Sequence, residues 1–144
     1  MPKQITPSSF RKYGKIIHYP DIHSKDKKKN LFRIVLSESE GHGWRIAYLV
    51  VRDKSIIDLE RHPGTFETFE PVKGRALLYV AAGRDARKID CFLLNKPIVL
   101  LKGIWHGVVA VDNEAEIKIT ENAVVSSEYW RTGLRLNGVF RKKA

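Results

Sequence analysis

The feature that most constrains the fold is a succession of short β-rich segments that fills the chain from residue 31 onward. Val, Ile, Leu and aromatic residues dominate these segments, and Gly, Pro, Asp or Asn marks nearly every junction between them. The predicted strands are residues 31–36, 44–51, 56–59, 66–72, 76–81, 89–94, 98–101, 105–111, 116–120 and 134–140. So many short strands predict an all-β sandwich or barrel, and they leave an immunoglobulin-like sandwich and a jelly roll both open.

Helical signals are confined to two short stretches. Thr6 can cap a helix and Pro7 suits its first position, which predicts a short helix at residues 7–13. We expect a strand at 16–19 directly after this helix, and one helical turn or more at 126–131 near the other end of the chain. The chain is therefore predicted to be almost entirely β-structure.

Length and charge narrow the class of protein further. The 144 residues suit one domain, residues 1–144, because no repeat or linker divides them. The net charge of +10 suggests an anionic partner, but residues 1–30 and 131–144 carry the whole excess and the middle of the chain is nearly balanced. Short basic ends are typical of solvated tails, so we do not expect a nucleic-acid partner.

The cysteine count and the hydropathy pattern indicate in which cellular compartment the protein is expected. Cys91 is the single cysteine, which excludes an internal disulfide and suits a reducing environment. No apolar run approaches the roughly 20 residues of a membrane span, and the first residues do not resemble a secretory signal. We therefore expect a cytoplasmic protein with no membrane partner.

The chemically informative residues are two histidines and two glutamates. Glu60 and His62 are two residues apart, so on a strand they point to the same side. Glu67 opens the next predicted strand, and a hairpin between these strands would bring it beside them, while His106 begins a later strand. Converging imidazoles and carboxylates form a site for a divalent metal ion. The alternatives are a turn histidine for His62, a solvated residue for Glu67, a core histidine for His106 and a surface ion pair for Glu60.

The spacing of these residues resembles the two sequence motifs of the cupin superfamily. The first motif, His-x-His followed by Glu and Gly, is matched by Glu60, His62, Glu67 and Gly74, with Glu60 in place of the first histidine. The second motif, Pro-x-Gly-x-x-His, is matched by residues 101–106, with a leucine in place of the proline. The resemblance implies an all-β, cupin-type double-stranded β-helix, or jelly-roll barrel. The metal ligands that it implies are Glu60, His62, Glu67 and His106.

One part of the chain resembles a particular cupin family, the ureidoglycolate lyases of allantoin breakdown. The shared pattern is Glu-Arg-His-Pro-Gly-Thr at 60–65, followed by Phe69, Pro71, Lys73 and Gly74. Residues 103–106 resemble that family's Trp-His strand, and residues 5–17 resemble its opening helix and first strand. The similarity runs from about residue 5 to residue 111 and is lost in the C-terminal part of the chain.

The resemblance implies a lyase that splits ureidoglycolate into glyoxylate and urea. This reaction needs a cation for the substrate carboxylate, for which Arg45, Arg52 and Lys73 are the candidates. It also needs a base for the hydroxyl proton, for which the candidates are His106, Glu67 and Glu60. We assign catalysis to His106 and Glu67, expect a divalent metal ion of unspecified identity, and expect no organic cofactor.

A second function remains open beside the lyase. The changed first ligand and the different C-terminal part favour a non-catalytic or differently specialised metal-binding cupin that binds a small carboxylate or a sugar. Jelly rolls often associate through exposed edge strands, so a homodimer is expected with either function.

Overall fold

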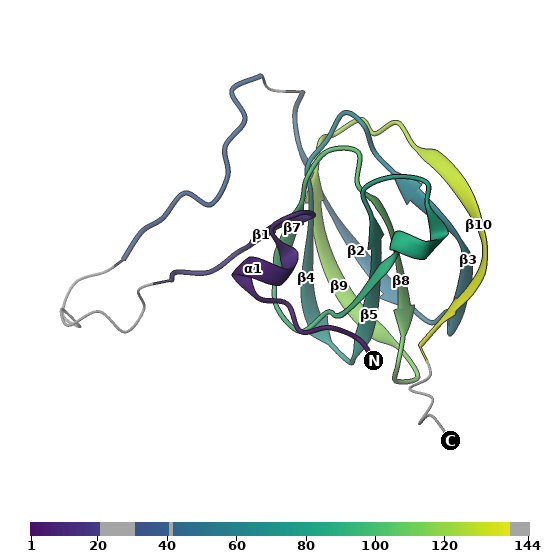
Figure 1. The fold of residues 1–144 in the computed structure, drawn as a ribbon. Coiled ribbons are helices and arrows are strands. Elements are labelled where there is room, and N and C mark those ends of the chain that lie inside the picture. The colour runs from purple at the N-terminus through teal and green to yellow at the C-terminus, as the bar shows by residue number, and fades with distance from the viewer. Residues whose placement is uncertain (21–30, 41, 139–144) are drawn as a thin grey trace.

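The computed structural model describes residues 1–20, 31–40 and 42–138, and it consists almost entirely of antiparallel β-sheet (Figure 1). The elements are α1 (Pro7–Phe10), β1 (Gly14–Ile16), β2 (Arg45–Val51), β3 (Ser55–Arg61), β4 (Glu67–Lys73), β5 (Ala76–Ala81), the 3-10 helix η1 (Ala86–Lys88), β6 (Asp90–Leu93), β7 (Ile98–Leu100), β8 (Trp105–Ala110), β9 (Ala115–Glu121) and β10 (Glu128–Asn137). Two five-stranded sheets, in the orders β1-β7-β4-β9-β2 and β10-β3-β8-β5-β6, form the barrel. The predicted all-β jelly roll is confirmed.

The alternation of apolar and polar residues fixes which faces of the sheets are buried. In β9 every second residue, from Ala115 to Glu121, is buried, and the residues between them are half-buried. β5 and β7 are buried almost throughout, as expected for strands covered on both faces. The inner faces of both sheets pack into one main hydrophobic cluster, which includes Phe69, Leu78, Ile98 and Ile117.

The N-terminal helix is shorter than predicted, at one turn, and it packs beside β1 and β6. Its capping box is reciprocal: the Ser9 backbone N–H donates to Oγ1 of Thr6 at 3.0 Å, and the Thr6 N–H donates to Oγ of Ser9 at 2.9 Å. Phe10 and Tyr13 pack edge-on or tilted against each other and against Phe92, with ring centroids 5.2 to 5.9 Å apart. This aromatic cluster anchors the helix to β6.

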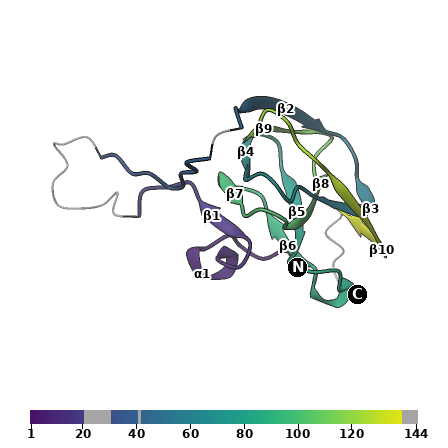
Figure 2. The ribbon, with the colours of Figure 1, turned by 90° about the horizontal axis from the view of Figure 1, so that it is seen from above.

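Two secondary-structure predictions are wrong. Residues 31–36 form no strand because no strand edge pairs with their backbone within the described residues. They run outside the barrel (Figures 1 and 2), where Arg33 donates to the carbonyl oxygen of His18 at 2.8 Å. The helical turn predicted at 126–131 is instead largely β10, in which Glu128, Tyr129 and Trp130 pair with β3. Cross-strand partners outweigh the weak local helical signal here.

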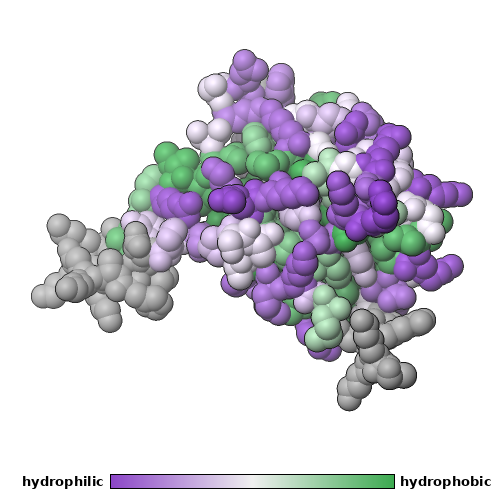
Figure 3. All heavy atoms as spheres, viewed as in Figure 1, coloured by the Kyte–Doolittle hydropathy of each residue, from purple (hydrophilic) through white to green (hydrophobic). Residues whose placement is uncertain are grey.

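The remaining boundaries differ from the predictions by a few residues. The strand expected at 16–19 is β1, which ends at Ile16, and the last predicted strand begins earlier, at Glu128. Its predicted end at residue 140 lies outside the described residues. Not all apolar surface is buried: the face of the molecule in Figure 3 exposes hydrophobic side chains between hydrophilic ones.

Candidate metal centre

Two imidazole rings face each other inside the barrel. His62 follows β3 and His106 lies in β8, both are buried, and their ring centroids are 5.2 Å apart. Nδ1 of His106 donates to the carbonyl oxygen of Ile104 at 3.0 Å, and Nδ1 of His62 lies 3.1 Å from Oγ of Ser127. When Nδ1 carries the proton, Nε2 of the neutral ring presents a lone pair, which is how metal-ligating histidines are commonly oriented.

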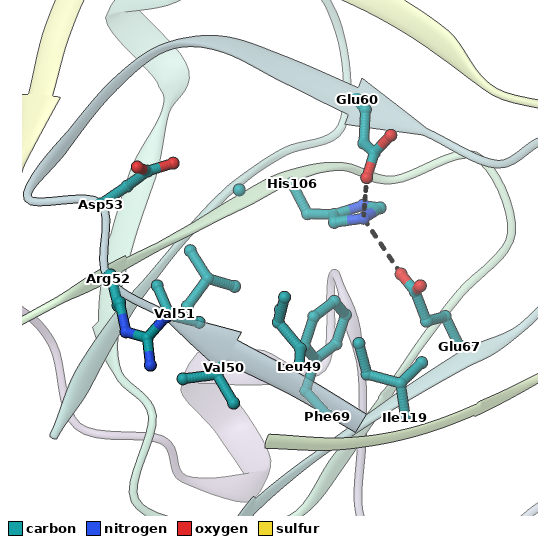
Figure 4. Close-up of a pocket in the computed structure, with 12 residues that line it drawn as sticks. Leu49, Val50, Val51, Arg52, Asp53, Glu60, Glu67, Phe69, His106 and Ile119 are labelled. Carbon is teal, nitrogen blue, oxygen red and sulfur yellow. Dashed lines mark ion pairs between the residues drawn. The ribbon is translucent and has the colours of Figure 1, made fainter. Parts of the chain in front are cut away.

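Two carboxylates, those of Glu60 and Glu67, approach Nε2 of His106 from opposite sides (Figure 4), and both also lie near Nε2 of His62. Glu67 places Oε1 3.0 Å from Nε2 of His106 and Oε2 3.6 Å from Nε2 of His62. Glu60 places Oε1 3.8 Å from Nε2 of His62 and 3.9 Å from Nε2 of His106. The structure therefore brings together all four of the predicted ligands.

The strand arrangement that places Glu67 at the cluster differs from the hairpin that the sequence analysis expected. β3 and β4 form no hairpin, because β3 lies in one sheet and β4 in the other. Glu60 is paired with His106 across β3 and β8, whereas Glu67 projects toward them from the facing sheet. The site is thus built between the two sheets.

Glu121 is a member of the cluster that the sequence analysis missed. It pairs with Glu67 across β9 and β4, and its side chain is only 5% exposed. Arg45 holds its Oε2 with two hydrogen bonds of 2.9 and 2.7 Å. The predicted strand ended at Thr120, but the alternation of buried Ile117 and Ile119 places the next inward position at residue 121. Continuing that alternation by one residue would have found it.

The cluster shifts the pKa values of its members in opposite directions. Burial opposes ionisation of Glu67, but the neighbouring His106, with Glu121 and His62, outweighs burial and lowers the pKa of Glu67. Burial likewise disfavours a charged His106, yet Glu67 and the other acceptors around the ring raise its pKa. Burial and the adjacent Glu67 carboxylate raise the pKa of Glu121, against the opposing effect of Arg45.

The donor set fits a divalent metal ion. Glu60, His62 and His106 form one group whose ligand atoms lie within 4.8 Å of one another, and His62, Glu67 and Glu121 form a second. Although His106 lies close to Glu67, Oε1 of Glu67 and Oε1 of Glu121 are buried without an aligned hydrogen-bond donor. Two imidazoles and up to three carboxylates suit a borderline or hard divalent ion.

A cavity of about 380 Å³ gives access to one side of this cluster. Glu60, Glu67 and His106 form one end of its wall in Figure 4, and Leu49, Phe69 and Ile119 form an apolar wall beside them. Mixed apolar walls with a few converging polar groups are typical of sites for small molecules.

The three predicted carboxylate-binding cations occupy different places. Arg52 lines the cavity, its side chain is 75% exposed, and its Nε binds Glu114 at 3.0 Å. Arg45 is bound to Glu121 and does not line the cavity. Lys73 lies at the end of β4, exposed beside a separate hollow near Arg75. Among these three, the structure brings only Arg52 to the cavity.

Comparison of the structure with solved proteins identifies the fold. It is similar to a dTDP sugar isomerase from Desulfovibrio desulfuricans G20, with a TM-score of 0.52 and 14% sequence identity over 81% of this chain and 80% of that one. This likeness, which covers most of both chains, shows a cupin-type jelly-roll barrel. At this identity it shows the fold alone.

Two longer proteins match less well. A vicilin from Solanum lycopersicum (tomato) has a TM-score of 0.48 at 17% identity, and the S161A mutant of Bacillus subtilis oxalate decarboxylase has 0.47 at 16%, over 63% and 62% of this chain. This chain spans about a quarter of their length, 26% and 24%.

At the level of sequence, no protein-family model matches the chain, and no curated protein is significantly similar to it. Within the described residues, no helix has the length and apolar character needed to cross a membrane.

Proposed function

We propose that the protein is a divalent-metal-dependent lyase that cleaves ureidoglycolate to glyoxylate and urea. The observation that carries the metal dependence is the convergence of two Nε2 atoms and two carboxylates at 3.0 to 3.9 Å. Each Nδ1 atom lies near a carbonyl oxygen, that of Ile104 for His106 and that of Ser126 for His62. The choice of substrate rests on the resemblance of residues 60–74 to the ureidoglycolate lyases.

The residues that would hold the metal ion are Glu60, His62, Glu67 and His106, with Glu121 adjoining Glu67. A divalent ion bound there would supply a Lewis acid that acidifies a substrate hydroxyl group and balances the substrate carboxylate. The remaining chemistry falls to side chains that border the cavity.

Cleavage requires the hydroxyl proton of ureidoglycolate to leave as the carbon–nitrogen bond breaks. The hydroxyl oxygen becomes the aldehyde oxygen of glyoxylate, and the proton ends on the departing nitrogen of urea. Glu60 is the base best placed for this transfer, because its side chain is 37% exposed and lines the cavity, whereas His106 and Glu67 are buried. Glu60 has two carboxylate oxygens, so one can hold the metal ion while the other accepts the proton. His106 and Glu67, which are buried, act by positioning.

Substrate binding falls to Arg52. Its side chain is largely exposed, so it can leave Glu114 for a substrate carboxylate at little energetic cost. The apolar wall formed by Leu49, Phe69 and Ile119 limits the water around the reacting atoms.

The test combines metal binding with product formation in two matched variants. Glu67 and Glu70 both lie in β4, but Glu67 faces the cluster while Glu70 faces outward and binds Lys118. We expect Glu67→Gln to lose Mn²⁺ binding in calorimetry and to lose glyoxylate formation, and Glu70→Gln to retain both. Wild-type protein should lose activity after treatment with a chelator and regain it when a divalent metal is restored.

The same experiment separates the lyase from the second function. A protein that binds Mn²⁺ through Glu67 but never releases glyoxylate is a metal-binding cupin for another small carboxylate or sugar. A protein in which Glu67→Gln leaves metal affinity unchanged has no metal centre at these residues, and the proposal fails entirely.

A further inference from the structure

The two strands that carry Glu60 and His106 are paired at a single position. Among the described residues, β3 and β8 share one register pair, Glu60 with His106, whereas β8 pairs with β5 at six positions and β3 pairs with β10 at six. Figure 4 shows these two side chains together, with Oε1 of Glu60 3.9 Å from Nε2 of His106. Metal centres tolerate only small errors in ligand position, so contacts other than the backbone pairing must fix this distance.

Arg61 and Trp105 lie opposite each other directly behind this pair. In the antiparallel register that pairs Glu60 with His106, the next residue of β3 comes opposite the preceding residue of β8. Because successive side chains of a strand point to opposite faces, Arg61 and Trp105 project from the face of the sheet that lies away from the metal centre. The guanidinium carbon of Arg61 is 4.7 Å from the centroid of the Trp105 ring.

The Trp105 ring is shielded from water. Its side chain belongs to the smaller hydrophobic cluster, together with Leu59 and Leu136, and Trp105 is only 1% exposed. Trp130 of β10 packs edge-on against it, with ring centroids 5.8 Å apart. A cation–π contact is stronger when water is excluded from it, and a side-chain pair across two strands stabilises their pairing. The Arg61–Trp105 contact therefore reinforces the sparse pairing of β3 with β8.

Glu128 fixes the orientation of the Arg61 guanidinium. Nε of Arg61 donates to Oε2 of Glu128 at 2.9 Å, and Nη2 lies 2.7 Å from the same oxygen. The two residues are also directly paired across β3 and β10. A planar guanidinium that is held by two of its nitrogens and stacked on an indole has little freedom to move. Arg61 thus links β10, β3 and β8 at the level of the candidate metal ligands.

We propose that Arg61 is a positioning residue of the metal centre: by stacking on Trp105 and binding Glu128, it holds Glu60 and His62 in register with His106. Arg61 lies between Glu60 and His62 in the chain, so a displacement of its backbone displaces both ligands. The inference rests on the metal centre of the proposed function but not on its substrate.

The charge of Arg61 predicts the opposite effect on metal binding, which separates positioning from electrostatics. Removal of a nearby cation makes a site more favourable for a divalent metal ion. Arg61→Gln should therefore tighten Mn²⁺ binding if Arg61 acts through its charge, and weaken it if Arg61 positions the ligands. Arg84 offers a matched control, because its guanidinium carbon lies 5.0 Å from the same Trp105 ring but it belongs to the segment between β5 and η1.

Calorimetry and electron paramagnetic resonance of bound Mn²⁺ test the inference. We expect Arg61→Gln to weaken Mn²⁺ binding by about 10- to 100-fold and Arg84→Gln to leave it nearly unchanged. At saturating Mn²⁺, the zero-field splitting should differ from that of wild-type protein in Arg61→Gln but not in Arg84→Gln, because only Arg61→Gln alters the ligand geometry. Circular dichroism checks that each variant is folded. If Arg61→Gln does not fold, Arg61→Lys takes its place, since lysine keeps the charge but lacks the planar fork.

The outcomes distinguish this inference from the proposed function. Unchanged or tighter Mn²⁺ binding in Arg61→Gln, with Glu67→Gln still losing the metal ion, overturns the positioning role and leaves the metal centre in place. An equal loss of affinity in Arg84→Gln also overturns it, because any cation beside Trp105 would then have the same effect. Wild-type protein that binds no Mn²⁺ overturns the metal centre and this inference together.

Discussion

Gly74 and Gly103 form a matched pair that tests how tightly the end of β4 is packed. Both have left-handed backbone conformations, with φ of +74° and +76°. A Cβ atom at Gly74 would lie 2.3 Å from the carbonyl oxygen of Glu114 and 3.0 Å from Cα of Ala115, whereas at Gly103 it would meet no atom within 4 Å. The two substitutions therefore share the conformational cost and differ in the steric one.

The magnitudes follow from these two contributions. An alanine in the left-handed region costs about 1–2 kcal/mol, which is the whole cost expected for Gly103→Ala. At Gly74 the backbone of Glu114 and Ala115, where β9 begins, must also move to make room for the methyl group. Overpacking of this kind adds about 1–3 kcal/mol to the loss of stability. Gly74→Ala should therefore unfold at a temperature lower than that of Gly103→Ala, by roughly 3–10 °C for a chain of this size.

The assay is thermal and urea unfolding of both variants in the presence of a chelator, so that bound metal does not contribute to stability. Equal urea m-values would show that the unfolded states are comparable. Equal losses of stability in the two variants would refute the reasoning, because they would mean that the close approach of Gly74 to Glu114 costs nothing to relieve.

Two further predictions concern single carboxylates. Burial opposes ionisation of Asp90, but the hydrogen bonds from Lys3 and Tyr13 outweigh burial and lower the pKa of Asp90 below the usual 3.8. The ionised Asp90 therefore stabilises the fold above pH 3.8, and this stabilisation is lost as the pH falls through the pKa of Asp90 in the folded state. Asp90→Asn should cost about 1 kcal/mol in urea unfolding at neutral pH and almost nothing at acid pH; an equal cost at both would contradict this. Glu121→Gln should weaken Mn²⁺ binding by about 10- to 100-fold in calorimetry, whereas Glu116→Gln, on the outward face of the same strand, should leave it unchanged.

The local sequence was enough to predict most strands, because apolar and polar residues alternate along each strand and turn-forming residues separate one strand from the next. It failed at residues 31–36, whose apolar composition is typical of a strand but whose backbone finds no partner within the described residues. It also failed at 126–131, where pairing of Tyr129 and Trp130 with β3 decides the conformation. Both errors concern pairing between distant segments, on which propensity carries no information.

The sequence predicted four residues of the candidate site, but it did not predict the strand arrangement that brings them together. Same-side placement of Glu60 and His62 follows from the period of a strand, and their proximity in the structure agrees with it. The assumed hairpin for Glu67 was wrong because strand order across a jelly roll depends on the whole topology. Lys73 was also wrongly expected at the site. It lies six residues beyond Glu67 on β4, at the far end of the strand and away from the cavity.

The cost of the buried cluster is the strongest physical reason to regard it as functional. Three carboxylates and two imidazoles lie together, and of the Lys and Arg residues that the structure describes, only Arg45 forms an ion pair with them. Without a metal ion, burial and mutual repulsion must be offset by protons, as the raised pKa values of His106 and Glu121 indicate. A divalent cation would displace these protons and balance the carboxylates, so metal binding should release protons and strengthen as pH rises. A jelly roll stabilised by its apolar core has no need of such a cluster, whereas a metal centre depends on it.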